Sequence, residues 1–272
     1  MKKVILITGA SSGMGKESAK ELINQGHTVY TVARRIEQMQ DLKQLGGRPI
    51  EMDVTNEKDI QKVVDTIIQK EGKIDVLWNN AGYGLFGSVE DVPMVEAKKQ
   101  FEVNVFGLAA LTQKVVPYMR KANSGTIINT SSMGGKLYTP LGAWYHASKH
   151  AVEGFSDCLR IELKEFNINV VVLEPGIIKT EWSDIMLQNI SKFSLKGAYS
   201  VLTNKLIASS KKMFEKGQGS KPDVIAKTIL KIVNTNKPKT RYLVGFMAKP
   251  MVWMRLNLGD RVFDKIIMSQ VK

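Results

Sequence analysis

The chain of 272 residues is 43% hydrophobic and 24% charged, which is ordinary for a soluble globular protein with ample sequence for a buried core. Its one cysteine, Cys158, excludes an internal disulfide and suits a reducing compartment; its place on an apolar helix predicts a buried side chain rather than a nucleophile. The apolar run after Lys3 is too short for a signal peptide, and no run approaches the length of a membrane span, so we expect a cytoplasmic protein.

The net charge of +13 is concentrated towards the C-terminus. Residues 178–272 contain 18 Lys and Arg but only 6 Asp and Glu, so they carry +12, which leaves +1 for residues 1–177. Three interpretations are open: a solvated basic surface, attraction of an acidic substrate or carrier, or peripheral contact of a basic amphipathic tail with anionic membrane lipid. Specific nucleic-acid binding is not expected, because the sequence has no recognition motif for it.

A short β-branched run, Val4–Thr8, precedes a glycine-rich turn that ends at Gly15 and a helical pattern that stops at Gly26. Strand, turn and helix in this order are typical of a nucleotide-binding unit, in which glycines let the backbone approach a pyrophosphate and the helix N-terminus attracts negative charge. A Walker loop is excluded, because Ala10 stands where its first glycine is required and Glu17 where Ser or Thr would bind magnesium. The G-x-G-x-x-G spacing is also absent, and a glycine-rich loop without a ligand is the remaining alternative.

The second predicted strand, Val29–Ala33, ends in Arg34 and Arg35. In dinucleotide folds an acidic residue at this point accepts a hydrogen bond from the ribose of NAD, whereas an arginine pairs with the 2′-phosphate of NADP. No acidic residue occurs here before Glu37, so the sequence favours NADP(H) over NAD(H). The alternative is a pair of arginines that only caps the strand end at the surface.

The other predicted strands are also apolar, β-branched runs rather than alternating patterns, which indicates a parallel sheet covered on both faces. These strands are Ile50–Val54, Asp75–Asn79, Thr126–Thr130, Asn169–Glu174 and Arg241–Val244. The predicted helices are Glu37–Leu45, Asn56–Glu71, Met94–Lys121, a helix that contains Tyr145 and ends near Phe166, and Pro222–Val233.

Polar residues follow several of these strands. Asp53 is expected either to bind an adenine amino group or only to cap the next helix. The small and amide residues from Asn79 to Gly82 suit close packing against a planar ligand. Asn104 stands among apolar neighbours in a long helix, and a buried amide needs hydrogen-bond partners. It is either a structural hydrogen-bond node or a kink that holds a water near the site.

The pattern with the clearest chemistry is Tyr145-x-x-x-Lys149. Residues four apart lie on one helix face, so the phenol and the ammonium can point into one cleft. A cation near a phenol lowers its pKa from about 10 towards the range of a general acid or base. Ser132, at the end of a strand, supplies a hydroxyl that could polarise a carbonyl. Alone the pattern is weak, because many exposed helices carry Tyr and Lys at this spacing.

Together these motifs resemble those of the short-chain dehydrogenase/reductase family, from Val4 to about Thr180. The resemblance rests on the order and spacing of T-G-x-x-x-G-x-G (Thr8–Gly15), N-N-A-G (Asn79–Gly82), Asn104, Ser132, Tyr145-x-x-x-Lys149 and Pro175-Gly176. It implies an α/β fold: a single Rossmann-type domain, residues 1–272, with a doubly wound parallel seven-stranded sheet and helices on both faces. Residues 178–220 would form a helical substrate lid, and residues 245–272 a basic C-terminal tail.

The resemblance implies a role for each matching residue. Tyr145 would be the catalytic acid/base, Ser132 would bind the substrate oxygen, and Asn104 would anchor a water that relays protons. Lys149 would hold the nicotinamide ribose and lower the pKa of Tyr145. The implied cofactor site comprises Gly9, Ser11, Ser12, Gly13, Met14, Gly15, Arg34, Arg35, Asp53, Val54, Asn80, Ala81, Gly82, Tyr145, Lys149, Pro175, Gly176, Ile178 and Thr180. No metal is implied; the three histidines are scattered, and His146 and His150 are interpreted as helix-face residues.

The expected activity is NADP(H)-dependent interconversion of a carbonyl and an alcohol by hydride transfer, in the hydroxysteroid- and retinol-dehydrogenase-like branch. Apolar residues in the lid region and Trp144 beside Tyr145 indicate a bulky, apolar small-molecule substrate, and the cationic lid hints at an anionic one. Members of the family often pair through the helices that contain Asn104 and Tyr145, so a homodimer or homotetramer is expected. The alternatives are an NADP-binding sensor without turnover and a lipid-surface-associated protein on the same fold.

Overall fold

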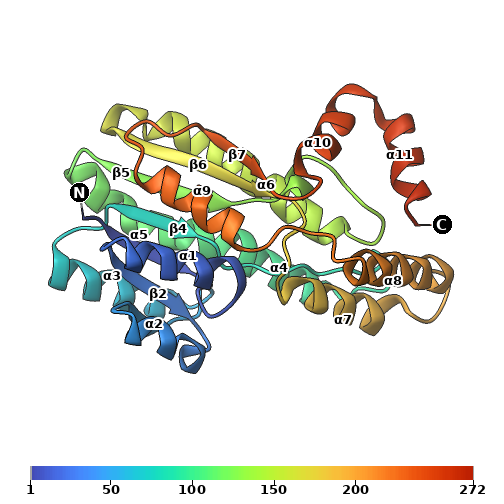
Figure 1. The fold of residues 1–272 in the computed structure, drawn as a ribbon, viewed down its shortest axis with the longest axis horizontal. Coiled ribbons are helices and arrows are strands. Elements are labelled where there is room, and N and C mark those ends of the chain that lie inside the picture. The colour runs from blue at the N-terminus through green and yellow to red at the C-terminus, as the bar shows by residue number, and fades with distance from the viewer. Residues whose placement is uncertain (1, 272) are drawn as a thin grey trace.

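The computed structural model describes residues 2–271, and its centre is a seven-stranded parallel sheet (Figure 1). The strands lie in the order β3-β2-β1-β4-β5-β6-β7, and every neighbouring pair is parallel. The strand order reverses beside β1, as in a Rossmann-type sheet, so the predicted fold class is confirmed. The strands are β1 (Val4–Thr8), β2 (Thr28–Ala33), β3 (Arg48–Glu51), β4 (Val76–Asn79), β5 (Gly125–Thr130), β6 (Ile168–Pro175) and β7 (Arg241–Val244).

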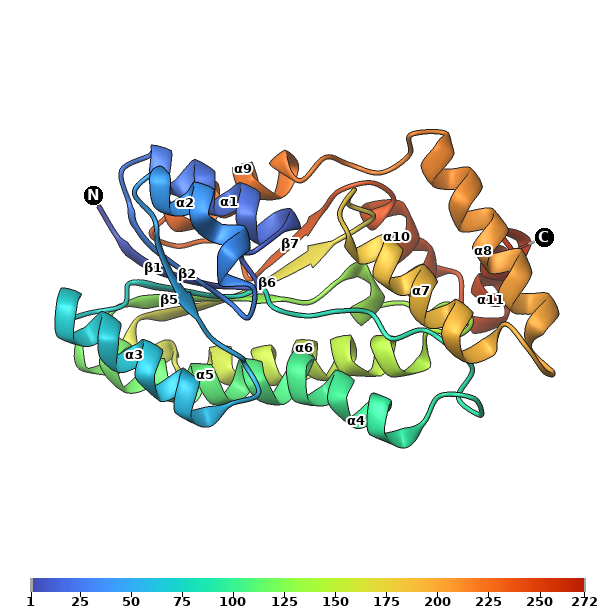
Figure 2. The same ribbon diagram turned by 90° about the horizontal axis from the view of Figure 1, so that it is seen from below.

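Helices cover both faces of the sheet (Figure 2). One layer contains α1 (Gly13–Asn24), α2 (Gln40–Gln44) and α9 (Asp223–Val233). The opposite layer contains α3 (Glu57–Glu71), α4 (Met94–Phe101), α5 (Gly107–Lys121) and α6 (Ala143–Glu162).

The residues of β1 show why the sheet needs both layers. All five are buried, and successive side chains of a strand point to opposite faces. Ile5 and Ile7 belong to the core beneath α1 and α9, whereas Val4 and Leu6 belong to the core beneath α3 and α5. A strand buried on both sides is a continuous apolar run, which is the pattern that the sequence contains.

The long helix predicted at Met94–Lys121 is interrupted by one π-helical turn, Glu102–Phe106, which contains the buried Asn104. Such turns occur as single insertions in α-helices, frequently at functional sites. The helix that contains Tyr145 ends at Glu162 rather than near Phe166, and a separate 3-10 turn follows it.

The third strand ends at Glu51, so Asp53 lies in the turn beyond it. The carboxylate of Asp53 accepts hydrogen bonds from the backbone and the hydroxyl of Thr55. The side chain of Asn56 caps α3 instead, accepting from the backbone of the first turn. The alternative in which Asp53 caps this helix is therefore wrong, because its carboxylate accepts hydrogen bonds from Thr55 in the turn before α3.

Cys158 is exposed, so the prediction of a buried thiol is wrong. The buried face of α6 runs through Tyr145, Lys149, Val152 and Ser156. Position 158 lies off this face, because the helical period of 3.6 residues turns it towards solvent. The helical period of the segment predicts the exposure of Cys158, whereas its overall apolar character does not.

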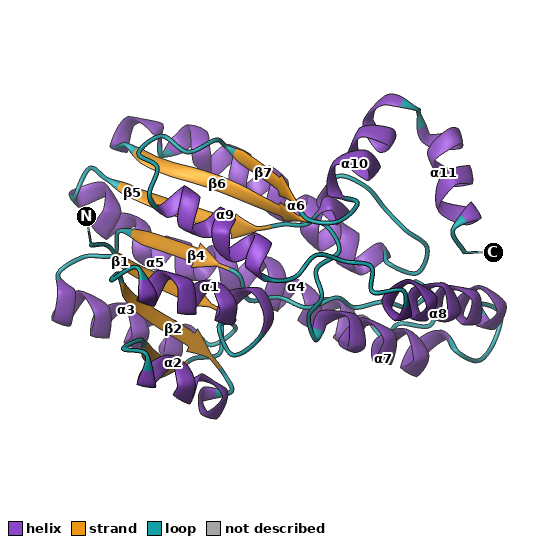
Figure 3. Cartoon of the chain, viewed as in Figure 1, coloured by secondary structure: helices purple, strands orange, loops and turns teal. Residues whose placement is uncertain are grey.

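The last third of the chain is mostly helical and extends past the C-terminal ends of the strands (Figure 3). Its helices, besides α9, are α7 (Trp182–Ser194), α8 (Ser200–Glu215), α10 (Ala248–Asn257) and α11 (Asp260–Ser269). In residues 2–271, none of the helices combines the length and the apolar character that crossing a bilayer requires.

Candidate active site

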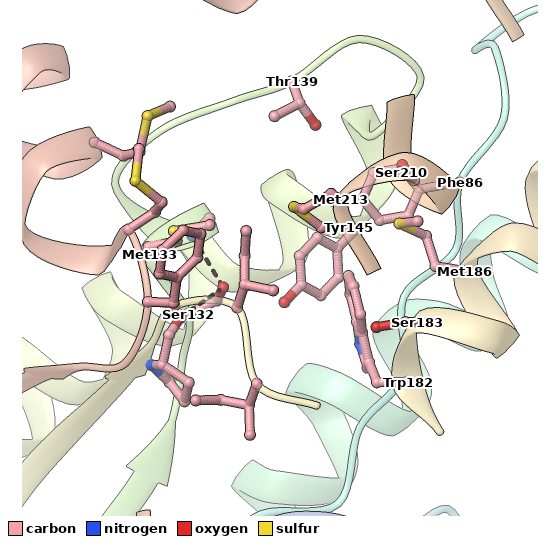
Figure 4. A pocket seen from close by; sticks show the side chains of 18 of the residues that line it. Phe86, Ser132, Met133, Thr139, Tyr145, Trp182, Ser183, Met186, Ser210 and Met213 are labelled. Atoms are coloured by element: carbon pink, nitrogen blue, oxygen red, sulfur yellow. Dashed lines mark hydrogen bonds between the residues drawn. The ribbon is translucent and has the colours of Figure 1, made fainter. Parts of the chain in front are cut away.

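A cavity of about 630 Å³ lies at the C-terminal edge of the sheet. In open α/β sheets, ligands bind outside the carboxyl ends of the strands, where the strand order reverses. The cavity is lined by the ends of β5 and β6 and by helices α6, α7, α8, α10 and α11. The lining residues include Ser132, Tyr145, Trp182, Met186 and Met213 (Figure 4).

The loop between β1 and α1 is built for close backbone approach. Gly9 and Gly13 have positive φ angles of 66° and 54°. A Cβ at Gly15 would lie 2.4 Å from the Gly9 carbonyl oxygen and 2.7 Å from the Asn80 side-chain nitrogen. Helix α1 begins after Ser12, whose side chain makes no capping bond, and its first turn has no acidic residue. An uncapped helix start without a competing carboxylate fits the pyrophosphate of a dinucleotide.

Arg35 lies over this loop. Its Nη2 is 3.2 Å from Ser11 Oγ, 3.3 Å from Ser12 Oγ and 3.5 Å from Glu181 Oε2, just before α7. The guanidinium therefore links the glycine-rich loop to the beginning of the C-terminal helices. Its donors can serve a phosphate, because a planar guanidinium presents several N–H groups in a fixed arrangement.

Arg34 is exposed and faces a different neighbour. Burial raises the pKa of Tyr83 to about 12; Glu96 adds to this rise and the charge of Arg34 opposes it. Arg35 thus contacts the glycine-rich loop, whereas Arg34 makes no side-chain hydrogen bond or ion pair among the described residues.

Asn80 holds the glycine-rich loop in place. The backbone N–H groups of Asn80 and Ala81 both donate to Thr8 Oγ1 at 2.9 Å. The Asn80 side-chain nitrogen donates to the carbonyls of Thr8 and Gly9 at 3.1 and 3.2 Å. Its buried Oδ1 has no hydrogen-bond partner among the described residues. Asn80 thus supports the loop, and one polar atom remains that a ligand could satisfy.

Asn104 is a structural hydrogen-bond node, which is the first of the two alternatives that the sequence allows. Its side chain is 1% exposed. Nδ2 donates to the Tyr83 carbonyl at 3.0 Å and to Ser148 Oγ at 3.1 Å, and Oδ1 accepts from the Tyr83 N–H at 3.1 Å. A Cβ at Gly82 would lie 3.0 Å from Asn104 Oδ1 and 3.6 Å from Lys149 Nζ. The Asn104 side-chain amide therefore joins the loop after β4, which contains Gly82 and Tyr83, to α6 beside Lys149.

Ser132 and Tyr145 face each other at the cavity (Figure 4). Ser132 Oγ accepts a hydrogen bond from the Gly134 N–H at 3.0 Å and donates to the Pro175 carbonyl at 3.5 Å. Tyr145 is 7% exposed. Its ring packs against Phe86, with centroids 5.5 Å apart. These contacts hold both hydroxyls at the same wall.

The expected low pKa of Tyr145 is not found. Burial raises its pKa to about 12, although the hydrogen bond with Ser132 opposes the rise. Lys149 Nζ donates to the Thr130 carbonyl at 2.8 Å, and burial lowers the pKa of this ammonium to about 8, with Glu153 opposing. Desolvation outweighs the attraction that the Tyr-x-x-x-Lys spacing led us to expect, because both groups are buried.

The segment that closes the site comes from the end of β6. A Cβ at Gly176 would lie 2.3 Å from the Phe246 carbonyl oxygen, so only glycine fits there. Ile178 forms an isolated bridge with Ser220 and lines the cavity. The Thr180 side chain lies against the glycine-rich loop, 3.1 Å from where a Cβ on Gly13 would be.

The predicted residues fall into two groups. The cavity lining includes Met14, Asn80, Gly82 and the set from Ser132 to Thr180. It does not include Asp53, Val54 or the two arginines, which lie at the ends of β2 and β3, on the other side of β1. The other predicted residues outside the lining are Gly9, Ser11, Ser12, Gly13, Gly15, Ala81 and Asn104. One ligand would have to run along the sheet edge to contact both groups, as a dinucleotide does.

Three aromatic residues, Phe86, Trp144 and Trp182, lie where the sequence does not predict them. Trp182 packs on Tyr145 with ring centroids 5.2 Å apart, and Phe86 contacts both rings. Trp144, which the sequence suggested for the substrate side, instead lines a separate hollow with Phe101 and Phe106. Neighbouring helix positions point about 100° apart, so adjacency to Tyr145 argued against a shared cavity.

His146 is a buried clamp rather than a helix-face residue. Its Nδ1 is 2.9 Å from the Gly134 carbonyl, and its Nε2 is 3.1 Å from the Thr139 N–H, so Nδ1 carries the proton and Nε2 accepts. Burial lowers its pKa to about 4, which keeps the ring neutral. It thereby ties the loop after Ser132 to α6.

A family model described as short chain dehydrogenase matches residues 3–190. The chain belongs to this family. It is therefore an oxidoreductase that acts on carbonyl or alcohol groups with a nicotinamide dinucleotide. Among residues 2–271, no group of three or more His, Cys, Asp or Glu is placed to hold a metal ion.

Two curated relatives match almost the whole chain. It is 38% identical over 264 residues to a 3-ketodihydrosphingosine reductase of Bacteroides thetaiotaomicron, covering 94% of each chain. It is 36% identical over 261 residues to the probable short-chain type dehydrogenase/reductase VdlC of Helicobacter pylori strain J99, covering 96% of this chain and 95% of the relative.

Solved structures show the same fold. A short-chain dehydrogenase from Streptomyces avermitilis has a TM-score of 0.80 and 32% identity, covering 95% of this chain and 93% of that one. Serine dehydrogenase complexed with NADP+ scores 0.78 at 26% identity, covering 89% and 94%. The 3-ketoacyl-(acyl-carrier-protein) reductase of Brucella melitensis complexed with NADH scores 0.75 at 27% identity, covering 88% and 94%. The last two neighbours contain different nucleotides, so the fold alone does not select one.

Proposed function

We propose that the protein reduces an apolar or bulky carbonyl compound with NADPH, with Tyr145 as the proton donor. The observation that carries this proposal is the convergence of two hydroxyls, those of Ser132 and Tyr145, at the wall of an apolar cavity (Figure 4). Lys149 lies one helical turn further along α6, with its ammonium buried beneath the same wall. A binder without turnover has no chemical need for this set.

The bound nicotinamide supplies or accepts the hydride. Ser132 donates a hydrogen bond to the carbonyl oxygen and holds it beside Tyr145. A phenol with a pKa of about 12 is protonated at pH 7, so Tyr145 passes its proton to the oxygen as negative charge develops there. Lys149, with a pKa of about 8, is mainly protonated at pH 7 and stabilises the phenolate that remains. The high pKa of Tyr145 favours carbonyl reduction near neutral pH.

We assign the dinucleotide to the edge of the sheet from β3 to β6. The loop Gly9–Gly15 would hold the pyrophosphate, and Asp53, Val54 and the loop Asn80–Gly82 would border the adenosine half. Lys149 and the segment Pro175–Thr180 would contact the nicotinamide half. The common position of Asn104 and Lys149 beside Gly82 supports a water-mediated proton relay between them.

Tyr145→Phe tests this assignment. Without the phenolic proton, turnover of a carbonyl substrate should fall by about 10³-fold, while NADPH binding is retained. The substrate is found by following NADPH oxidation over long-chain ketones, aldehydes, steroids and quinones. Tyr118→Phe, which removes a hydroxyl from α5 away from the cavity, is the matched control. Wild-type turnover in Tyr145→Phe would refute the proton-donor role.

The preference for NADP(H) rests on Arg34 and Arg35. Arg35 contacts both serines of the glycine-rich loop, and Arg34 is exposed beside it, so either could pair with a 2′-phosphate. Arg34→Ala and Arg35→Ala should each weaken binding of NADPH more than binding of NADH, measured as dissociation constants. Equal losses for the two nucleotides in both variants would contradict this preference.

We further propose that residues 1–272 act as one domain, in which residues 178–220 cover the substrate. Helices α7 and α8 provide much of the apolar cavity wall, including Trp182, Met186 and Met213. Such a cover excludes water from the reacting carbonyl. The two curated relatives above carry neither a steroid nor a retinol name, so the hydroxysteroid- and retinol-dehydrogenase-like branch stays a prediction.

We propose a homodimer or homotetramer that pairs through α4, α5 and α6. Phe106, 55% exposed, borders a shallow apolar hollow of about 210 Å³ together with Phe101 and Trp144. Exposed aromatic groups beside an apolar hollow are typical of interface centres. Phe106→Glu should reduce the mass measured by light scattering to that of a monomer. An unchanged mass would place the contact elsewhere.

Peripheral membrane contact through α10 and α11 also stays a proposal, as does a cytoplasmic location. Several apolar side chains there are exposed among cations: Trp253, Leu256, Val262 and Met268 beside Lys249, Arg261 and Lys265. Such surfaces bind anionic bilayers through buried apolar area and charge. The double variant Trp253→Ser and Leu256→Ser should bind less to anionic phospholipid vesicles in co-sedimentation. Absence of binding by the wild type would refute the contact.

A further inference from the structure

We propose that the end of the cavity far from Tyr145 recognises a negatively charged group, through Lys212 and Lys216. This inference rests on the proposed function and narrows its substrate class to amphipathic carbonyl compounds. Such a compound has an apolar body and carries a carboxylate or a phosphate at the end opposite to its carbonyl.

The cavity has two chemically distinct ends. Ser132, Tyr145 and the neutral His146 lie at the inner end, on the sheet and α6. The outer end is bounded by α8, α10 and α11, where the Ser209 hydroxyl donates to the Gln270 carbonyl at 2.6 Å and joins α8 to the end of α11. Between the two ends the lining is mainly apolar, with Met133, Leu137, Met186, Met213, Met251 and Ile267.

The charged residues of this lining are all cationic. Lys149, Lys212 and Lys216 line the cavity, and within residues 2–271 no Asp or Glu belongs to the lining. Lys149 is buried and donates to β5, so the exposed Lys212 and Lys216 are the two charges of this lining that remain for a ligand. A substrate with an amine at this end would find no carboxylate, whereas an anion would find two ammonium groups.

Both lysines come from the C-terminal end of α8. Lys212 lies in its last turn, and the backbone N–H of Lys216, just beyond Glu215, donates to the Lys212 carbonyl at 3.2 Å. Neither ammonium has a carboxylate within 4.0 Å among the described residues. Lys179 adds a third cation, since its Nζ lies 3.8 Å from where a Cβ on Gly217 would be.

Helix α8 also supplies an internal control. Lys205 and Lys211 are exposed on the same helix but do not line the cavity. Replacing either pair removes the same charge from the same helix, so net charge and long-range attraction change equally. Only Lys212 and Lys216 should matter for an anion held inside the outer end.

The test compares aldehydes of equal chain length that end in a methyl group, in a carboxylate or in a phosphate. In the wild type, KM should be lower for the charged aldehydes, and the chain length with the lowest KM should report the distance from Tyr145 to the lysines. The double variant Lys212→Gln and Lys216→Gln should raise KM for the charged aldehydes about tenfold with little change in kcat, since exposed ion pairs are individually weak. KM for methyl-ended aldehydes should not change.

The double variant Lys205→Gln and Lys211→Gln should behave as the wild type towards all three series. The advantage of the charged aldehydes should also shrink as salt rises, because exposed charges are screened. A carboxylate preference without a phosphate preference would indicate a free fatty acid type of substrate, and the reverse would indicate a phosphorylated one. Equal KM values for charged and methyl-ended aldehydes in the wild type would overturn the inference.

A binding measurement separates this inference from the proposed function. Calorimetry with a long-chain carboxylate and with the primary alcohol of equal length requires no turnover. Tighter binding of the carboxylate, lost in Lys212→Gln and Lys216→Gln, would support the anion site even if no aldehyde is reduced. Turnover of methyl-ended aldehydes without preference for the carboxylate in either measurement would refute the anion site and leave the reductase standing.

Discussion

Two walls of the cavity differ in how they are held. The shelf, which we define as residues 131–149, carries the proposed catalytic groups. Its buried His146 clamps the loop, and its buried Lys149 is anchored on β5. The outer wall, which we define as α8, α10 and α11, has few buried side chains. Single side chains such as Phe263 and Ile267 anchor it, while Trp253 and Leu256 face solvent.

The proposed function would explain this difference. Hydride and proton transfer require reacting groups to be positioned closely, and buried hydrogen bonds hold the shelf in one arrangement. An apolar substrate chain needs only a surface of suitable shape, and methionines supply an adaptable one. Substitutions should therefore cost much at the shelf and its supports, and little at the outer wall.

The largest loss of stability is expected beneath the shelf, at Arg241. Its guanidinium is 3.1 Å from Glu153, 2.6 Å from Asp157 and 3.4 Å from Glu174. Arg241→Met should lower the free energy of unfolding by about 3 kcal/mol, because it leaves the buried Glu174 without its cation and leaves the buried Glu153 with Lys136 alone. Urea unfolding measures this loss, and Lys239→Met, at an exposed position nearby, should change it by less than about 0.5 kcal/mol.

This loss should grow with pH. Burial, with Glu153 adding to it, raises the pKa of Glu174 to about 7. A carboxyl whose pKa is higher in the folded state than in the unfolded state favours folding only while protonated, and this contribution disappears as pH rises through 7. In Arg241→Met, the ionised form of Glu174 is destabilised more strongly, because the cation that pairs with it is gone. A loss that is larger at pH 5 than at pH 8 would contradict this explanation.

The next largest effect is expected at His146. Its replacement by Phe leaves the Gly134 carbonyl and the Thr139 N–H without partners, which should cost about 2–3 kcal/mol in urea unfolding at pH 7. His150→Gln, on the exposed side of the same helix, is the control. A cost for His146→Phe no larger than that of the control would mean that the clamp does not hold the shelf.

His146 also predicts a pH dependence. Its pKa is lowered to about 4, from about 6.5 in an unfolded chain, so the neutral ring stabilises the fold above pH 6.5 and this contribution is lost as pH falls towards 4. His146→Phe should therefore show a shallower loss of stability across this range than the wild type. Identical slopes would count against a neutral, buried ring.

A smaller effect is expected at the outer wall. Met213 is half-buried on α8 and lines the cavity. Met213→Ala should destabilise the protein by less than about 1 kcal/mol, because the site is open to solvent and can relax. It should nevertheless raise KM for long apolar aldehydes more than for short ones. A stability loss as large as that of His146→Phe would remove the difference between the two walls.

The smallest effect is expected on the outer face of the helix that carries Tyr145. Cys158 is exposed, so Cys158→Ser should change the free energy of unfolding by no more than about 0.5 kcal/mol. The melting temperature should shift by a correspondingly small amount. The thiol should also react fully with a maleimide in the native protein. Reaction only after unfolding would show that the side chain is covered, for instance by another subunit.

The sheet and the glycine-rich loop were predictable because their signals are local. Most strands are short apolar runs, with β3 (Arg48–Glu51) as an exception, and Gly9, Gly13 and Gly15 are needed within a few residues of one another. Residues whose partners are distant in the sequence could not be predicted. Arg241 meets Glu153 across 88 positions, and no period or spacing records such a contact.

The parallel sheet and the glycine-rich loop after β1 can be predicted from the sequence, because they depend on side-chain period and short spacings. The candidate set Ser132, Tyr145 and Lys149 comes from the resemblance of the assembled motifs. The protonation of that set depends on contacts between distant segments. Phe86 and Trp182, from segments far from Tyr145 in the chain, bury its phenol and raise its pKa to about 12, where spacing alone predicted a lower value. Burial is a property of the whole fold, and here desolvation is the main cause of the raised pKa.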